Sequence, residues 1–158
     1  MREILFRGKP KNKSDLILVS QMKPENVLDD FVLGLLMIKD DRYFICISTM
    51  GVSNGSLINN CISSVVEVIP ETVGQYTVLT DKNGKKIFEG DIIRFDENLY
   101  TVQRECDTPG GYWAETGYIL KHIGWSDYTS FTSTIDDWEN ECQVFIIGNI
   151  HNNPELLK

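Results

Sequence analysis

Residues 65–95 read VVEVIPETVGQYTVLTDKNGKKIFEGDIIRF, a stretch with two turn signals between apolar runs. The first signal is Asn83-Gly84, a pair that tolerates the two positive φ angles of a type I′ hairpin turn. The second is Gly90-Asp91, because glycine accepts a positive φ angle and an aspartate can bind nearby backbone amides. We therefore predict antiparallel hairpins here, with structural turn roles for these four residues.

Apolar runs on both sides of this stretch predict further strands. They cover residues 3–7, 15–22, 31–38, 43–49, 99–103, 112–123 and 144–150. The Leu-rich run 31–38 also fits a helix, but Gly34 and the β-branched and aromatic run that follows favour a strand. The polar residues 39–42 between these two runs predict a hairpin loop.

The remaining segments predict the connections and one helix. Residues 51–64 are rich in Gly, Ser and Asn, which is typical of a connection, and we place a boundary after them. This gives an N-terminal β segment, 1–64, packed on a β-barrel core, 65–158, unless the chain is one compact unit. A short helix is predicted within 132–141, where a hydroxyl residue can cap the start and acidic residues follow. The predicted fold class is mainly β: a small barrel of antiparallel hairpins with an N-terminal β extension.

The composition is that of a globular protein with an acidic surface. The chain has 158 residues, of which 42% are hydrophobic and 24% charged, and its formal net charge is −8. Nonspecific binding to DNA or RNA depends on clusters of Lys and Arg, so this charge disfavours nucleic acid as a partner. Basic residues do gather near the N-terminus, where a solvated arm is a more usual interpretation than a phosphate site. They are Arg2, Arg7, Lys9, Lys11 and Lys13.

The chemically reactive side chains do not form a recognisable metal or cofactor motif. The four cysteines are Cys46, Cys61, Cys106 and Cys142. No pair has CxxC spacing and the N-terminus lacks a secretory signal pattern, so we expect reduced thiols and a cytoplasmic location. His122 and His151 are too few for a zinc site on spacing grounds. No apolar run is long enough to span a bilayer. We therefore expect no metal, no cofactor and no membrane.

Four phrases, in order along the chain, resemble the YopX family of phage and prophage proteins. They are MREILFRGK (1–9), PETVGQYT (70–77), DKNGKKIFEGDII (81–93) and IGNIHNNPELL (147–157). The resemblance covers the chain in outline. It implies a mainly β protein with an SH3-like barrel, acting in the cytoplasm of a bacterial host cell. It supplies no catalytic, cofactor-binding or metal-binding residues, because the shared phrases consist of turn formers and strand residues.

A noncatalytic protein-interaction module is the leading hypothesis for function. Aromatic side chains are favoured anchors at interfaces, although most rings in a β protein fill its core. The candidate interaction aromatics are Tyr112, Trp113, Tyr118, Trp125 and Tyr128. A protein partner is expected, and exposed edge strands also favour self-association into a homo-oligomer.

Two other function classes stay open. A small barrel can bind single-stranded nucleic acid by stacking bases on aromatic rings, or an acidic protein can mimic DNA. A cysteine-dependent enzyme would use Cys106 or Cys142 as nucleophile and His122 or His151 as base. The chain has no glycine-rich phosphate loop, HExxH motif or nucleophile elbow, so we predict that it is not an enzyme.

Overall fold

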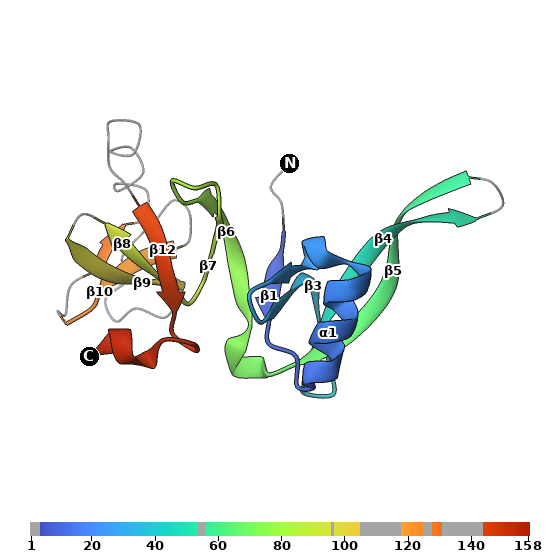
Figure 1. Cartoon of the computed structure of the whole chain (residues 1–158), viewed down its shortest axis with the longest axis horizontal. Coiled ribbons are helices and arrows are strands. Elements are labelled where there is room, and N and C mark those ends of the chain that lie inside the picture. The colour runs from blue at the N-terminus through green and yellow to red at the C-terminus, as the bar shows by residue number, and fades with distance from the viewer. Residues whose placement is uncertain (1–3, 54–55, 96, 105–117, 125–127, 131–143) are drawn as a thin grey trace. The chain divides into compact units, whose positions relative to one another are not determined.

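A computed structural model of the protein shows two compact units, Met1–Gln75 and Tyr76–Lys158 (Figure 1). The described residues are 4–53, 56–95, 97–104, 118–124, 128–130 and 144–158, with the backbone alone for 48–63 and 128–130. Antiparallel strands dominate both units, so the mainly β prediction is confirmed. The units divide between Gln75 and Tyr76, whereas the composition of residues 51–64 predicted a boundary after Ser64.

The first unit is built on an antiparallel sheet of strand order β5-β4-β3-β1-β6, in which β2 also pairs with β3. Its strands are β1 (Phe6–Gly8), β2 (Val27–Leu28), β3 (Phe31–Lys39), β4 (Arg42–Ser53), β5 (Ser56–Val68) and the start of β6 (Gly74–Thr80). Two short 3₁₀ turns, Pro24–Asn26 and Pro70–Thr72, lead into β2 and β6.

The hairpin expected from residues 31–38 and 43–49 is confirmed as β3 and β4. Lys39 pairs with Arg42, so the turn between the strands consists of two residues. These residues, Asp40 and Asp41, have φ angles of 53° and 57°. Two consecutive left-handed residues match the twist of the flanking strands, and aspartate tolerates that conformation better than most residues.

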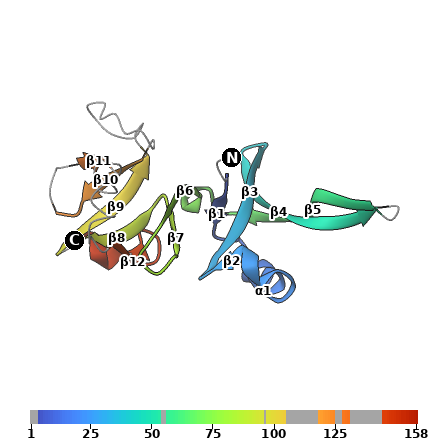
Figure 2. The same ribbon diagram turned by 90° about the horizontal axis from the view of Figure 1, so that it is seen from above.

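Residues 15–22 form a helix rather than the predicted strand. Helix α1 (Lys13–Met22) lies along one face of the sheet (Figure 2). Val19 is 4% exposed and Leu16 packs with it, because residues three apart share a helix face. Four consecutive apolar residues, 16–19, fit either element, and Pro24 can end either one, so the pattern alone led to the wrong assignment. The core beneath α1 consists of Val19, Val32, Ile45, Ile47, Val66 and Val68.

Residues 51–64 belong to a hairpin rather than to the predicted connection. β4 and β5 pair along their length to Ser53↔Ser56, with two register shifts on the way. β3 pairs with β4 no further than Cys46, so the rest of the hairpin is a two-stranded ribbon that extends beyond α1 and β3 (Figure 1). Gly, Ser and Asn suggested a loop, but strand pairing uses only backbone groups and therefore tolerates them.

The second unit contains a five-stranded sheet of order β11-β10-β9-β8-β12. Its strands are β8 (Asp91–Phe95), β9 (Asn98–Arg104), β10 (Tyr118–His122), β11 (Tyr128–Ser130) and β12 (Val144–Asn149), and the 3₁₀ turn Pro154–Leu157 follows β12. The hairpin of β6 and β7 (Lys86–Phe88) packs on this sheet, since Ile87 and Leu79 join its core. The other buried members of that core are Ile93, Val102, Tyr118, Leu120 and Val144.

The second unit is therefore barrel-like, but the strand pairing in the described part of the chain stays open at β11 and β12. The helix predicted within 132–141 lies outside the described residues. None of the helices in the described ranges reaches both the length and the hydrophobicity that crossing a bilayer requires.

Candidate interaction surface

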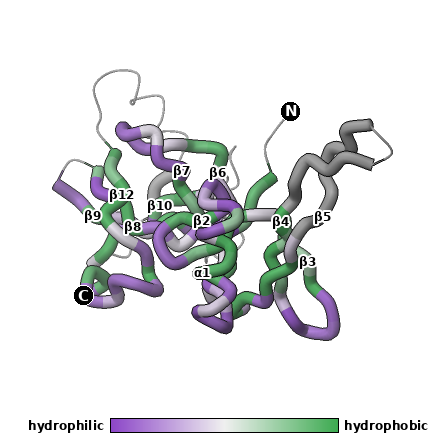
Figure 3. Tube along the Cα trace, turned by 45° about the vertical axis from the view of Figure 1, so that its right-hand side comes forward, coloured by the Kyte–Doolittle hydropathy of each residue, from purple (hydrophilic) through white to green (hydrophobic). Residues whose placement is uncertain are grey.

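Helix α1 exposes an apolar surface, which we call the outer face of α1. It consists of Ser14, Ile17, Leu18, Gln21 and Met22, which share one side of the helix at spacings of three and four residues. Ile17, Leu18 and Met22 are 58%, 54% and 62% exposed. A helix that covers a sheet normally turns polar residues to solvent. Here three of the five residues on the exposed side are apolar, α1 includes a hydrophobic stretch in Figure 3, and none of the five is charged.

The local sequence explains where α1 begins, where it ends and how it is rotated. The carbonyl of Asn12 accepts a hydrogen bond from the N–H of Asp15 at 3.1 Å, and the Asp15 carboxylate lies in the first turn, where it complements the helix dipole. At the other end the N–H of Lys23 donates to the carbonyl of Val19 at 2.7 Å. Burial of Val19 in the core sets the rotation of the helix and keeps the outer face in solvent.

The sheet face opposite α1 carries a smaller exposed apolar row. Leu35, Cys46 and Val65 are direct cross-strand neighbours on β3, β4 and β5. Leu35 and Val65 are 47% and 48% exposed, whereas Cys46 between them is 4% exposed. Burial raises the pKa of the Cys46 thiol, so this cysteine stays protonated and acts as a small apolar side chain rather than as a nucleophile.

Charged groups border this face at the C-terminal end of β5. The Glu67 carboxylate accepts hydrogen bonds from the Arg42 guanidinium and from the Lys11 ammonium. These bonds, chiefly those from Arg42, lower the pKa of Glu67 to about 2. The Arg42 guanidinium also lies 5.1 Å from the centre of the Phe44 ring. The N-terminal segment is thus joined to β4 and β5 through one shared carboxylate.

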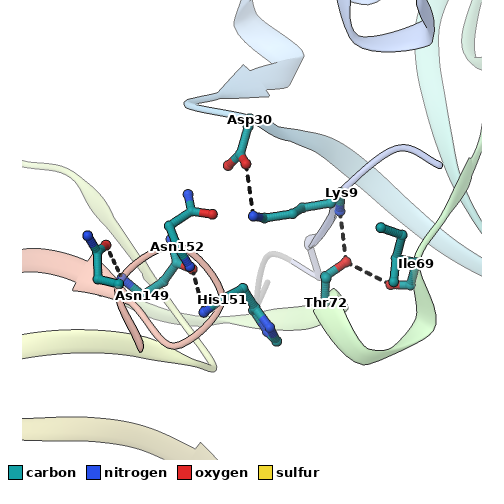
Figure 4. Close-up of polar contacts among 8 residues, drawn as sticks. Lys9, Asp30, Ile69, Thr72, Asn149, His151 and Asn152 are labelled. Atoms are coloured by element: carbon teal, nitrogen blue, oxygen red, sulfur yellow. Dashed lines mark hydrogen bonds and ion pairs between the residues drawn. The ribbon is translucent and has the colours of Figure 1, made fainter. Parts of the chain in front are cut away.

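Three of the N-terminal basic residues, Arg7, Lys9 and Lys11, are built into the first unit and do not form the predicted solvated arm, whereas Lys13 is exposed and Arg2 lies outside the described residues. Arg7 in β1 is 3% exposed, with its guanidinium 4.7 Å from the centre of the Phe31 ring. The Lys9 ammonium pairs with Asp30 at 2.9 Å, and the N–H of Lys9 donates to the Thr72 hydroxyl at 2.9 Å (Figure 4). These partners are distant in sequence, so the basic run looked solvated when it was considered alone.

The structure places the candidate aromatics in three different situations. Tyr118 is 3% exposed and belongs to the core of the second unit, so it offers no interaction surface. Tyr128 begins β11, where only the backbone is described. Tyr112, Trp113 and Trp125 lie outside the described residues. Sequence reasoning missed the outer face of α1 because it assigned that run to a strand. Once the run is known to be a helix, the spacing of Ile17, Leu18 and Met22 places them on one side of it.

The turn between β6 and β7 differs from the predicted type I′ turn. Within it only Gly84 has a positive φ angle, of 78°, and its N–H donates to the carbonyl of Asp81 at 2.9 Å. Asp81 is 6% exposed, and its carboxylate accepts from the N–H groups of Asn83 and Lys85 at 2.9 and 2.8 Å. Because the aspartate organises the turn, Asn83 does not need the left-handed conformation.

Gly90 and Asp91 join three segments of the second unit. Gly90 has a φ angle of 82°, its N–H donates to the carbonyl of Val102, and its carbonyl accepts from the N–H of Ile150, each at 2.9 Å. Asp91 is 2% exposed, and its carboxylate accepts from the N–H of Phe88 at 2.8 Å. Both residues therefore bind backbone groups within the fold.

The segment after β12 is held in the same way. The side-chain oxygen of Asn149 accepts from the N–H groups of His151 and Asn152, each at 3.0 Å (Figure 4). A Cβ on Gly148 would lie 2.3 Å from the side-chain oxygen of Asn153, so a larger residue does not fit there without moving Asn153. The polar residues of segment 149–153 therefore form a turn.

A concavity of about 520 Å³ opens in the second unit beside β9 and β10. Its lining is formed by Thr101, Gln103, Lys121, His122, Ile123, Gly124, Ile150 and Leu157. The His122 ring is hydrogen-bonded to the Asn98 side chain at 3.2 Å and packs edge-on against Tyr100. The two candidate nucleophiles, Cys106 and Cys142, lie outside the described residues. Among the residues that are described, no three His, Cys, Asp or Glu side chains gather to hold a metal ion.

The comparisons with known proteins agree with this fold. The crystal structure of protein EF1440 from Enterococcus faecalis resembles the chain over 100% of both chains, with a TM-score of 0.52 and 20% sequence identity, a level at which the likeness shows the fold alone. No curated protein matches the chain. The family model described as YopX protein matches residues 37–158, which include three of the four phrases quoted above. Because this match covers most of the sequence, the chain belongs to the YopX family.

Proposed function

We propose that the protein is a noncatalytic protein-interaction module that acts in the cytoplasm of a bacterial cell carrying a phage or prophage. The outer face of α1 is the observation that supports this proposal. Soluble proteins keep contiguous apolar patches small, and the patches that they do expose are often binding sites. Ile17, Leu18 and Met22 extend from one helix, whose rotation is set by the core, so they present a surface that is organised before binding.

The chemistry of this surface indicates what kind of partner it binds. Covering a large apolar side chain contributes about 1.5–3 kcal/mol, from which the cost of association is subtracted. Three such side chains on one helix suit a shallow apolar groove on another protein. The outer face carries no charge, so binding through it should depend little on salt. Met22 adapts to partner surfaces of different shape because its side chain is unbranched and flexible.

Capture from lysate of a bacterial cell that carries the phage or prophage tests the proposal. A photoreactive residue is placed at position 17 of an otherwise unchanged chain, and it should crosslink to the same partner in repeated experiments. The double variant Leu18→Lys/Met22→Lys should lose that product, because it places two charges in the apolar contact. Both side chains are more than half exposed, so stability should change by only about 0.5 kcal/mol.

A matched control uses another exposed apolar position, Leu35. Leu35→Lys adds the same kind of charge at a similarly exposed leucine on the opposite sheet face, and it should retain the crosslinked product. Equal capture by the wild type and by Leu18→Lys/Met22→Lys would contradict the proposal. The noncatalytic part is tested with a thiol-reactive probe: a cysteine that reacts faster in the folded chain than in the unfolded chain would favour the enzyme alternative.

Nucleic-acid binding has less support than protein binding. It needs cations that can contact phosphate, but Lys9 is paired with Asp30, Lys11 is paired with Glu67, and Arg7 is buried. The net charge of −8 also disfavours binding to nucleic acid. A gel-shift series at low salt should show no retardation of single- or double-stranded DNA, and retardation that weakens steeply with salt would restore this alternative.

A further inference from the structure

The ribbon at the end of the β4–β5 hairpin is uncharged. We define the ribbon as residues 47–53 of β4 and 56–64 of β5, which pair with each other. It lies within residues 43–66, a segment that contains no Asp, Glu, Lys, Arg, His or Pro. The whole chain is 24% charged and has a net charge of −8, so this neutral segment is a marked exception to the composition.

The ribbon has open strand edges in the part of the chain that is described. β5 is the last strand of its sheet and pairs with β4 alone, and β3 does not reach β4 beyond Cys46. The backbone N–H and C=O groups along such an edge can pair with another strand. Two strands without a third are also marginally stable in water. The ribbon is therefore the segment that would gain most from an added strand.

Among the described residues, the edge of β5 is covered at one end only. Pro10 forms a bridge to Val68, the N–H of Lys11 donates to the carbonyl of Glu67 at 3.0 Å, and the N–H of Ile69 donates to the carbonyl of Lys9 at 2.9 Å. Proline and lysine are the residues that commonly protect strand edges. This protection ends where the neutral segment begins, although the strand continues to Ser56.

We propose that the outer edge of β5 along the ribbon pairs with the same edge of a second copy, which produces a symmetric antiparallel dimer. Pairing a strand with its own copy in antiparallel orientation creates a two-fold axis and closes the assembly at two chains. The register shifts between β4 and β5 increase the local twist, and an identical strand has the same twist.

The charge distribution also favours pairing along the neutral segment 43–66. Two copies that each carry −8 repel one another over most of their surfaces, so their backbones can approach most easily along a neutral stretch. This proposal does not depend on the partner of the outer face of α1, because it concerns a different element and a different contact, main-chain pairing rather than side-chain docking.

Sedimentation and light scattering of charge variants test the dimer. Cys61 and Ile62 pair with consecutive β4 residues, so the two positions lie on opposite faces of β5. The variant Cys61→Lys/Ile62→Lys therefore places a positive charge on each face of the proposed contact. It also changes the net charge from −8 to −6, which weakens the general repulsion between copies. Loss of the dimer in this variant would therefore show that the two copies pair along β5, because the general repulsion between them is weaker than in the wild type.

Wild-type protein should have about twice the chain mass of 18.0 kDa, and Cys61→Lys/Ile62→Lys should have half the wild-type mass. Cys61→Glu/Ile62→Glu should also be monomeric, and an equal mixture of the two variants should regain the dimer because opposite charges then meet. That recovery shows that each variant is folded. Ser14→Lys/Gln21→Lys, which adds the same charge on α1, should stay dimeric.

A monomeric wild type at the highest soluble concentration would overturn the proposal, as would a dimeric Cys61→Lys/Ile62→Lys variant or a mixture that stays monomeric. A monomeric Ser14→Lys/Gln21→Lys variant beside a dimeric wild type would assign the contact to α1 instead. Crosslinking at position 17 remains the separate test of the α1 partner, so the failure of one proposal does not mimic the failure of the other.

Discussion

Replacing Asp81 with alanine should destabilise the second unit by about 2–4 kcal/mol, because a hydrogen bond to a charged acceptor contributes about 1.5–3 kcal/mol. One carboxylate oxygen accepts from the N–H groups of Asn83 and Lys85 at 2.9 and 2.8 Å, and the other lies 3.4 Å from the N–H of Ile146, where it adds little. Asn83 is exposed, so water can replace part of its bond in the variant. The estimate therefore lies below the sum of two full bonds.

Urea unfolding followed by circular dichroism measures this loss, and Asp81→Asn provides the control. The asparagine keeps a side-chain oxygen that can accept both turn bonds and loses only the charge, so its cost should be roughly half that of Asp81→Ala. If Asp81→Ala costs less than about 1 kcal/mol, Gly84 and the strand pairing hold the turn without the carboxylate. Equal costs for the two variants would show that charge, rather than hydrogen bonding, is the stabilising property.

Three further predictions concern single residues. Gly34→Ala should destabilise the first unit by about 3 kcal/mol, because its Cβ would lie 2.3 Å from the backbone oxygen of Cys46, and an unchanged melting temperature would contradict this. Glu67→Gln should be less stable than wild type at neutral pH, and this difference in unfolding free energy should shrink as the pH falls from 4.5 towards 2. A carboxylate with a lowered pKa contributes its full stabilisation above its ordinary pKa and loses it on protonation. A difference that stays constant over this range in urea titrations would exclude Glu67 as the titrating group. Val78→Gly should raise stability by about 0–1.5 kcal/mol, because relief of the left-handed φ of 75° gains about 1–2 kcal/mol and the greater backbone entropy that glycine loses on folding costs about 0.5–1 kcal/mol. A loss above about 1 kcal/mol in urea unfolding would refute that reasoning.

Local turn chemistry made part of the fold predictable. The hairpin around Asp40 and Asp41 follows from a short polar loop between two apolar runs, and Gly90 has the positive φ that its place before β8 suggested. The turn at Asn83 was placed correctly but its type was not. Its acceptor is the Asp81 side chain, which a dipeptide rule does not consider.

Features that depend on distant partners could not be predicted. Helix α1 needs a sheet to cover, and that sheet is assembled from residues later in the chain. The ribbon has the composition of a loop and becomes a pair of strands only because the two segments match in register. Arg7 and Lys9 looked solvated until Phe31 and Asp30 were brought beside them. The candidate surface was missed for the same reason, since its apolar side chains were expected to lie in a strand.

The pairing of β12 with β8 bears on how the chain is made. Pairings within the first unit use residues up to Gln75, whereas β8 can pair with β12 only after residues 144–149 have been synthesised. A chain that terminates early would therefore release one finished unit attached to another whose core lacks Val144. Chaperones and proteases that act on truncated products should therefore bind the incomplete second unit first.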